Sequence, residues 1–289
     1  MIYLKKIKIT LLIFLIAIIL SGCADKESLE NKKIEEEISY IDSKIISMLN
    51  KLNNIDLETY KINSNEITLQ NNDKKEKENS SKGNSDSGSQ GNSENNGNDE
   101  NSIEITKFDN SSVLDINTGE IKWEEIKNDI ETINESWNII KLELFKINNN
   151  SDVIQSFGNS LNNCIIAIKN EDKLSSMIAL PNLYSFLPAF LSQVSQDKSL
   201  IATKQTKAYI VSAYSNVDQN NWDNALADLT NAETEFLKVM NDLEFSKGKE
   251  SKINSIYINL KELQNVLSTK DLNLFLIHYK SILKEINKI

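Results

Sequence analysis

Few side chains in this sequence could carry chemistry. Its 289 residues include one His, two Cys and 42 Asp and Glu. His278 is the one imidazole that could serve a nucleophile as a base, and no Ser or Cys can be paired with it from the sequence. We expect His278 to lie at the surface or boundary of its helix. So few His and Cys all but exclude zinc fingers, haem sites and disulfide scaffolds.

The second cysteine and the neighbouring carboxylates have structural interpretations. Cys164 occupies a position in the apolar stripe of its helix, and a buried thiol is inert unless its pKa is lowered. The pairs Glu124 and Glu125, and Glu233 and Glu235, could hold a hard cation, but solvated helix faces are expected. The ligand patterns of di-iron bundles and of imelysin-like iron-uptake lipoproteins are missing. We predict no catalytic residue, no metal and no cofactor.

The first 23 residues have the pattern of an export signal. Lys5, Lys6 and Lys8 precede an apolar run over residues 9–20, which leads into Leu20-Ser21-Gly22-Cys23. As a helix the run would rise about 18 Å, well short of the roughly 30 Å hydrocarbon core of a bilayer. We therefore expect residues 1–22 to be removed as a signal peptide. An uncleaved anchor with a chance Cys is the alternative.

The four residues that end this segment resemble the lipobox of bacterial lipoprotein precursors, and all four positions fit. The resemblance implies that cleavage falls between Gly22 and Cys23 and that the Cys23 thiol receives diacylglycerol. Two acyl chains, at about 0.8 kcal/mol per buried methylene, hold a protein on a bilayer almost irreversibly. The expected location is the outer, extracytoplasmic face of the cell membrane, with the lipid as the only attached group.

The charge of the chain excludes one class of partner. All 32 basic residues are Lys, and the formal net charge is −10. Without Arg, the bidentate fork that phosphate and guanine recognition prefer is missing. Removal of residues 1–22 takes away three Lys and no acid, which changes the charge to −13. We expect no binding to nucleic acid, and repulsion by anionic lipids and wall polymers.

Apolar residues recur at helical spacing over most of the chain. A stripe from Ile34 to Ile55 predicts a helix over residues 27–54, with Glu35, Asp42 and Lys44 among its solvated residues. Nearly everything after residue 120 has the same periodicity. Polar breaks divide it into three helical hairpins, near residues 170–172, 220–221 and 268–271. The predicted fold class is all-α, an irregular antiparallel helical bundle built from helical hairpins.

An acidic, polar insert separates the first helix from the others. Residues 71–101 contain no apolar side chain and four of the eight Gly, so we expect disorder. The expected organisation is a signal peptide over 1–22, a lipid-anchored helix and linker over 23–70, the insert, and a bundle over 102–289. The helix over 27–54 should pack on that bundle. Residues 102–121 alternate weakly, and Asn117-Thr118-Gly119 supplies turn residues, so a short extended stretch or a hairpin is expected there.

Both prolines fall in the apolar stretch from residue 177 to 194, where they should kink or restart a helix. One interpretation is a broken helix that opens a groove or partner surface. The preferred interpretation is a buried central helix with Pro181 at a helix start. The residues of the candidate groove are Pro181, Tyr184, Phe186, Pro188 and Phe190.

Beyond the lipobox, the chain resembles the all-helical lipoproteins of clostridial and related bacteria in composition and texture. The resemblance implies a location and a fold, but no mechanism. We expect a non-catalytic bundle that acts as a binding or envelope accessory protein, with the membrane and an envelope protein as partners. The alternative is a lipid-anchored solute or metal receptor associated with a transporter. A hydrolase would need a Ser or Cys beside His278.

Overall fold

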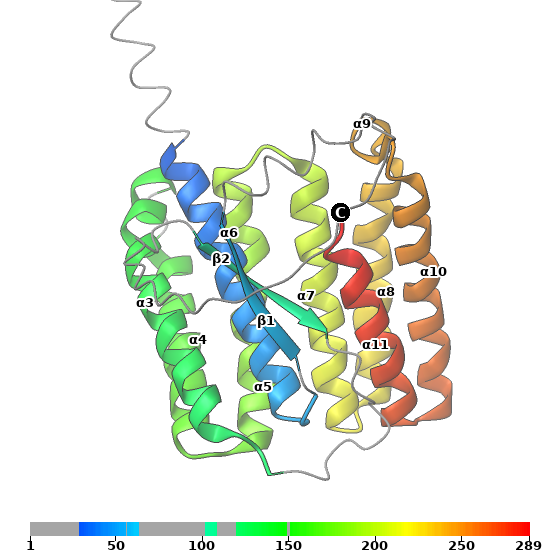
Figure 1. The fold of residues 1–289 in the computed structure, drawn as a ribbon, viewed down its shortest axis with the longest axis horizontal. Helices are drawn as coiled ribbons and strands as arrows, with labels where there is room; N and C mark the ends of the chain where they lie inside the picture. The colour runs from blue at the N-terminus through cyan, green and yellow to red at the C-terminus, as the bar shows by residue number, and fades with distance from the viewer. Residues whose placement is uncertain (1–28, 56, 64–101, 109–119, 149–150) are drawn as a thin grey trace, which may run out of the picture.

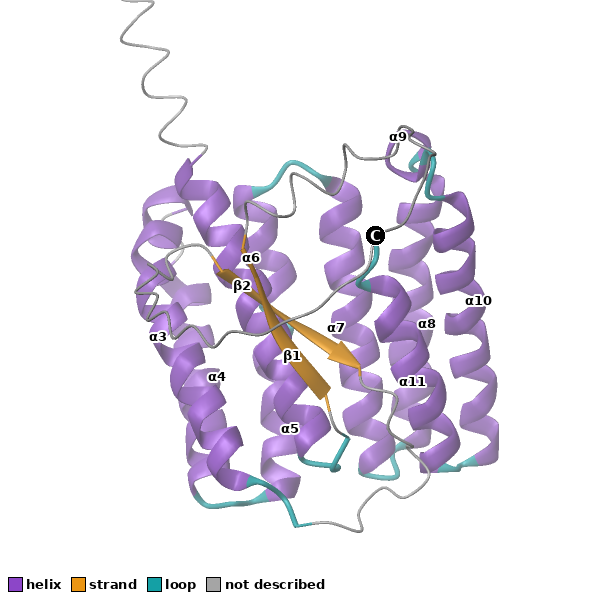
Figure 2. Cartoon of the chain, viewed as in Figure 1, coloured by secondary structure: helices purple, strands orange, loops and turns teal. Residues whose placement is uncertain are grey.

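A computed structural model describes residues 29–55, 57–63, 102–108, 120–148 and 151–289 (Figure 1). The predicted signal peptide over residues 1–22, the lipidation site Cys23 and the predicted disordered insert over residues 71–101 lie outside the described residues. The described chain is an all-α bundle with one added pair of strands (Figure 2). The predicted fold class is confirmed.

The helix over residues 29–51, called here the N-terminal helix, runs through the bundle instead of along its surface. Every position of its predicted stripe is buried, from Ile34 to Ile55. Its second half is also buried on its polar side, because Asp42, Lys44 and Asn50 are all inside the protein. The expectation that Asp42 and Lys44 are solvated is therefore wrong. An apolar stripe identifies one buried face, but neighbouring helices decide whether the opposite face is also covered.

Helical hairpins build the rest of the bundle, and the three predicted breaks are confirmed. The contacting pairs α4 and α5, α7 and α8, and α10 and α11 each fold back at one of these breaks (Figure 1). The helices are α3 (Trp123–Asn148), α4 (Ser151–Lys169), α5 (Lys173–Tyr184), α6 (Leu187–Val194), α7 (Lys198–Asp218), α8 (Trp222–Asn241), α9 (Leu243–Ser246), α10 (Glu250–Val266) and α11 (Leu272–Ile286), with a 3-10 turn, η1 (Leu267–Thr269), before α11.

Local signals fix these turns. Glu171, Asn220 and Lys270 each adopt the left-handed conformation that reverses the chain after a helix. Aspartates then start the helices that follow two of the turns, because Asp172 accepts a hydrogen bond from the Ser175 amide and Asp271 one from the Leu274 amide. Such caps contribute about 0.5–2 kcal/mol each. The helix boundaries therefore have causes that can be read from the sequence.

The proline-containing stretch forms α5 and α6, with a break at Ser185 and Phe186. Pro181 lies inside α5, whereas Pro188 lies in the first turn of α6. The expected proline at a helix start is thus Pro188 and not Pro181. By length and composition, Lys173–Val194 is the one segment among the described residues that could span a membrane, and 56% of it is buried in the bundle. Core helices meet the same criterion.

Two strands form a small antiparallel sheet. β1 (Leu57–Asn63) pairs with β2 (Ser102–Phe108), so that Leu57 faces Phe108 and Asn63 faces Ser102. An extended segment after residue 102 is confirmed, but its partner is a strand that precedes the polar insert. The sequence pointed to a hairpin within residues 102–121 because turn signals are local, whereas this pairing spans the whole insert.

Candidate functional site

A buried charged cluster lies where the N-terminal helix meets α5 and α7. We call Asp42, Tyr184, Lys204 and Lys207 the Asp42 centre. Asp42 Oδ1 accepts a hydrogen bond from the Tyr184 hydroxyl at 2.6 Å. Asp42 Oδ2 accepts from Lys204 Nζ and, at 2.7 Å, from Lys207 Nζ. Lys207 Nζ also donates to Asn287 Oδ1 at 2.9 Å, which joins the centre to the end of α11.

The Asp42 centre is buried and contains two lysines but one carboxylate, so it has one excess positive charge. These two features determine the pKa values of its members. Burial alone would raise the pKa of Asp42, but Lys204 and Lys207 outweigh it and hold that pKa well below its usual value. Burial lowers the pKa of Lys207 to about 8, although the attraction of Asp42 opposes the shift. Burial and the Asp42 charge raise the pKa of Tyr184. The tyrosine therefore stays neutral and acts as a donor.

Two further polar contacts hold the N-terminal helix. Asp129 on α3 accepts from Lys44 Nζ at 2.9 Å and from Lys51 Nζ at 2.7 Å. These ion pairs show that α3 runs antiparallel to the N-terminal helix, because Lys51 also lies 3.4 Å from Glu125, one turn earlier on α3. Lys44, which the sequence assigned to solvent, thus makes a contact between helices.

At the end of the N-terminal helix, Asn53 connects α5 and α7. Its amide nitrogen donates to the Tyr214 hydroxyl at 2.6 Å and to Asp218 Oδ1 at 2.8 Å. Its carbonyl oxygen accepts from Lys173 Nζ at 2.7 Å. Burial raises the pKa of Tyr214. Together with the Asp42 centre, these bonds fix the N-terminal helix at its middle and at its end.

The arrangement is suited to holding helices together. Each charged group of the Asp42 centre is almost fully buried and directed at another member of the centre. The hydroxyl of Tyr279 is buried and makes no hydrogen bond within the described chain. Burial raises the pKa of Tyr279, so it too is neutral. The buried Asp42 carboxylate and its two lysines therefore hold the N-terminal helix against α5 and α7.

The five residues predicted to line a groove belong to the core. Tyr184, Phe190 and both prolines are buried, and Phe186 is partly buried. Phe190 stacks on Trp137 with ring centroids 5.6 Å apart and meets Phe157 edge-on at 5.3 Å. The open-groove interpretation is therefore wrong for these side chains, and the buried central helix describes them. The break between α5 and α6 turns the apolar side chains inward because α3, α4 and α7 surround it.

The remaining candidates also occupy structural positions. His278 Nδ1 lies 3.5 Å from Glu262 Oε2 at the contact of α10 and α11, and the imidazole is partly exposed. Cys164 is buried, and burial raises the pKa of its thiol to about 12. Glu124 binds Lys127, whereas Glu235 binds Lys238. Within the described ranges, no three His, Cys, Asp or Glu side chains gather as metal ligands would.

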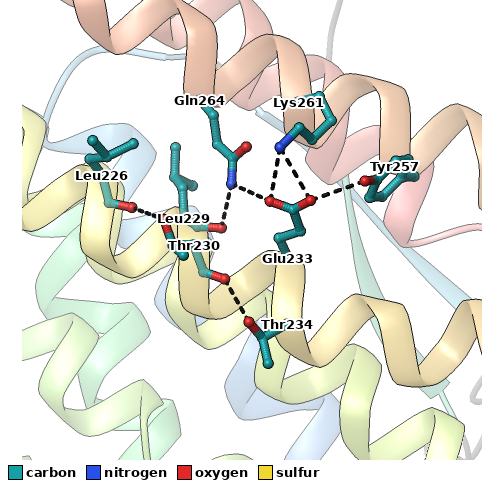
Figure 3. Close-up of polar contacts among 8 residues, drawn as sticks. All are labelled: Leu226, Leu229, Thr230, Glu233, Thr234, Tyr257, Lys261 and Gln264. Carbon is teal, nitrogen blue, oxygen red and sulfur yellow. Dashed lines mark hydrogen bonds and ion pairs between the residues drawn. The ribbon is translucent and has the colours of Figure 1, made fainter.

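Glu233 is the centre of a second polar network, between α8 and α10 (Figure 3). Its carboxylate accepts hydrogen bonds from Tyr257, Lys261 and Gln264, at distances of 3.0–3.2 Å. Burial would raise the pKa of Glu233, but these three donors lower it. Gln264 also donates to the Leu229 carbonyl oxygen at 3.0 Å. We call these four side chains the Glu233 network; Glu233 contributes to helix packing and is not a free carboxylate for a cation.

An open depression of about 260 Å³ lies where the turn between α7 and α8 meets the turn before α11. Amides and one carboxylate dominate its lining, together with an indole ring and an ammonium group. The lining residues are Asn220, Asn221, Trp222, Asp223, Asn224 and Lys270. Polar donors and acceptors of this kind could hold a small polar solute by hydrogen bonds.

The Asp42 centre was not found from the sequence, although one signal was present. Lys204 and Lys207 lie on α7, a helix whose buried residues occupy every side and include Ser199, Thr203 and Thr206. A helix with no clearly solvated face is a central helix, and a charge on it needs a buried partner. The sequence cannot indicate that Asp42, more than 160 positions away, is that partner.

Comparisons with known proteins add no relative. Neither a known protein family, nor a curated protein, nor a solved structure matches the chain.

Proposed function

We propose that this chain is a bacterial lipoprotein, anchored to the outer face of the cell membrane through Cys23, whose bundle acts as a binding or envelope accessory protein without catalysis. The observation that supports it most is the place of the N-terminal helix. This helix begins six positions after Cys23 and enters the core by Ile34. A lipid on Cys23 would therefore be connected directly to a helix that packs in the core of the bundle.

The use of the charged side chains supports a role in binding. In the described chain, the carboxylate and the lysine with the strongest perturbations, Asp42 and Lys207, stabilise contacts between helices. His278 lies beside Glu262 where α10 contacts α11, and Cys164 is buried in the core. Such a molecule acts through its surfaces. Crosslinking on intact cells, followed by mass spectrometry, would identify the envelope protein that contacts those surfaces.

A lipid-anchored solute receptor is the second candidate, and the depression beside Trp222 favours it. Polar solutes that bind only the folded chain would raise its melting temperature in proportion to their affinity. The screen should include sugars, amino acids and divalent cations. Asn221→Ala would remove one lining amide and should lower any shift that comes from this depression. A shift that Asn221→Ala leaves unchanged would have to come from another surface.

The anchor is tested by exchanging the two cysteines in turn. Cys23→Ala should abolish acyl labelling and release the protein from the membrane fraction, because two buried acyl chains supply the membrane affinity. Cys164→Ala is the matched control, since this buried thiol is remote from the motif, and it should keep both properties. Acyl labelling that persists in Cys23→Ala would contradict the proposed function.

A further inference from the structure

An exposed apolar patch lies on the last turns of α3. Leu142 keeps 62% of its surface exposed, and Ile139, Phe145 and Ile147 are exposed nearby. Ile139, Leu142 and Phe145 are spaced at i, i+3 and i+6, which places them along one outward strip of the helix. Leu29, at the start of the N-terminal helix, is 68% exposed. We call these five residues the apolar end patch.

The α3 residues of the patch all lie in the second half of that helix. In the first half of that helix, the outward residues are all polar, whereas the outward positions after residue 138 are mainly apolar. The residues of that polar half are Glu124, Glu125, Asn128, Glu131, Asn134, Glu135 and Asn138. A solvated helix needs no large apolar residues on its outer face. The change of character within one helix therefore marks a surface with a partner.

The patch lies at the end of the bundle where the chain enters from Cys23. α3 is antiparallel to the N-terminal helix, so its last turn is beside the first turn of that helix. The pKa of Lys146 is raised by its hydrogen bond to Glu143 and also by the charge of Glu30, which agrees with this placement. Figure 1 shows the start of the N-terminal helix and the end of α3 at the same end of the molecule.

The chain length ties the patch to the anchor. Six residue steps separate Cys23 from Leu29, and even a fully extended chain covers only about 20 Å in six steps. The opposite end of the bundle is much farther away. There Lys173 binds Asn53, which lies beyond the end of the N-terminal helix, and that helix of 23 residues is about 33 Å long. A lipid on Cys23 therefore keeps the apolar end patch close to the bilayer.

The charges around the patch suit the same occupant. Residues 136–148 contain Lys141 and Lys146 against the single acid Glu143, in a chain whose net charge is −10. Long lysine side chains can lie along an apolar surface and place their ammonium groups among lipid head groups. With Glu30, whose charge acts on Lys146, the local charge is balanced. Repulsion by an anionic membrane is therefore weaker here than on the first half of α3, whose exposed acids are Glu124, Glu125, Glu131 and Glu135.

We propose that the apolar end patch rests on the outer leaflet of the membrane, so that the lipid on Cys23 and the side chains of α3 hold the bundle in one orientation. The inference rests on the proposed function, because the anchor brings the patch to the bilayer. The bundle then presents its opposite end, with the turns at residues 170–172, 219–221 and 267–271, away from the membrane. The depression beside Trp222 lies at that end.

The test uses the full-length chain, produced with its leader in a host that processes lipoproteins and reconstituted in phosphatidylcholine–phosphatidylglycerol vesicles. Leu142→Cys and Leu174→Cys each carry an environment-sensitive fluorophore. Leu174 is the matched control, because it is similarly exposed, at 58%, and lies beside Lys173 at the opposite end. The buried Cys164 is the background, measured in the unsubstituted chain, and circular dichroism confirms that both variants fold.

The label at position 142 should shift its emission to shorter wavelength and lose most of its fluorescence when spin-labelled lipids are included, whereas the label at position 174 should do neither. Equal quenching at both positions, or quenching at 174 alone, would overturn the inference. A blue shift at 142 without quenching would overturn it as well, because a second copy or another protein would then cover the patch.

Mass spectrometry of the N-terminal peptide separates the inference from the proposed function. An acylated Cys23 with an unquenched label at 142 would overturn the inference alone. A chain that lacks acyl groups on Cys23 would contradict the proposed function, and quenching at 142 would then support the membrane contact on its own. An unacylated chain with an unquenched label would overturn both.

Discussion

The Asp42 centre and the Glu233 network use the same chemistry at different depths. In each, one carboxylate receives hydrogen bonds from a tyrosine, a lysine and a third donor. The donors to Asp42 lie on α5 and α7, whereas those to Glu233 all lie on α10. The side chain of Asp42 is 7% exposed and that of Glu233 is 19% exposed. Their lysines differ more, since Lys204 is 10% exposed and Lys261 is 44% exposed.

This difference in burial decides what each network contributes. Glu233 is partly exposed and its lysine is open to water, so water can replace these donors at a lower cost and the ion pair adds a small stabilisation. A buried carboxylate has no water to replace its partners, and loss of one charge leaves the others uncompensated. The Asp42 centre therefore fixes which helices surround the N-terminal helix, whereas the Glu233 network only supports a contact that apolar packing already makes.

Removal of the buried acid should have the largest effect. Asp42→Asn keeps the shape of the side chain but leaves Lys204 and Lys207 buried without a counter-charge. We expect the free energy of unfolding to fall by about 3–5 kcal/mol at pH 7. Urea denaturation of both proteins measures the change. A loss below about 1 kcal/mol would mean that water reaches the Asp42 centre and that burial does not determine how much the centre stabilises the fold.

The Asp42 centre should also make the free energy of unfolding depend on pH, and this effect should be smaller than that of Asp42→Asn. The pKa of Lys207 is about 8 in the folded chain and 10.5 in the unfolded one. Between these values the unfolded chain binds more protons at this site, so stability rises with pH there. Lys207→Met, which keeps the Asp42–Lys204 pair, should remove this rise, on the order of 1–3 kcal/mol.

Urea denaturation at pH 7, 8, 9 and 10 is compared between the unsubstituted chain and Lys207→Met. The contributions of other titratable groups are the same in both proteins and cancel in the difference. Cys164 is one such group, because its pKa is raised from 9.0 to about 12 and its contribution therefore falls with pH above 9. The difference between the unsubstituted chain and Lys207→Met is the quantity of interest. A difference that stays flat from pH 7 to 10 would show that Lys207 keeps its ordinary pKa in the folded chain.

The Glu233 network, which is the more exposed of the two, should respond least. Glu233→Gln removes the negative charge but keeps a side chain that can still accept hydrogen bonds from Tyr257 and Lys261. We expect a loss of less than about 1 kcal/mol in the free energy of unfolding, and a smaller loss at high salt. Thermal melting at low and high ionic strength tests both expectations. A loss as large as that of Asp42→Asn would remove the contrast between the two networks.

Much of the fold could be predicted from the sequence because its signals are local. The stripe from Ile34 to Ile55 identified the N-terminal helix, and the breaks near 170–172, 220–221 and 268–271 identified the hairpins. Apolar periodicity and turn residues act over a few positions, so one sequence is enough to show them. The antiparallel partner of β2 was missed, since β1 precedes a long polar insert.

The candidate site could be predicted only in part. Burial of Cys164 and the boundary position of His278 followed from their places in helical stripes. At Tyr184 and Phe190 the preferred interpretation, a buried central helix, is confirmed and the alternative of an open groove is wrong, because neighbouring helices cover both sides of that segment. The apolar strip at Ile139, Leu142 and Phe145 could have been noticed as a second stripe on α3, but its exposure depends on which helices lie beside it.

The sequence by itself determined the helices and their breaks, because these properties depend on residue type and on spacing within a few turns. Only the tertiary structure decided which polar residues of the N-terminal helix are buried. Asp42 and Lys44 look like members of a solvated face, and they became buried ion pairs because α3 and α7 close over that face. Burial of a helix on more than one side is a property of the whole assembly of helices, so no single helix encodes it.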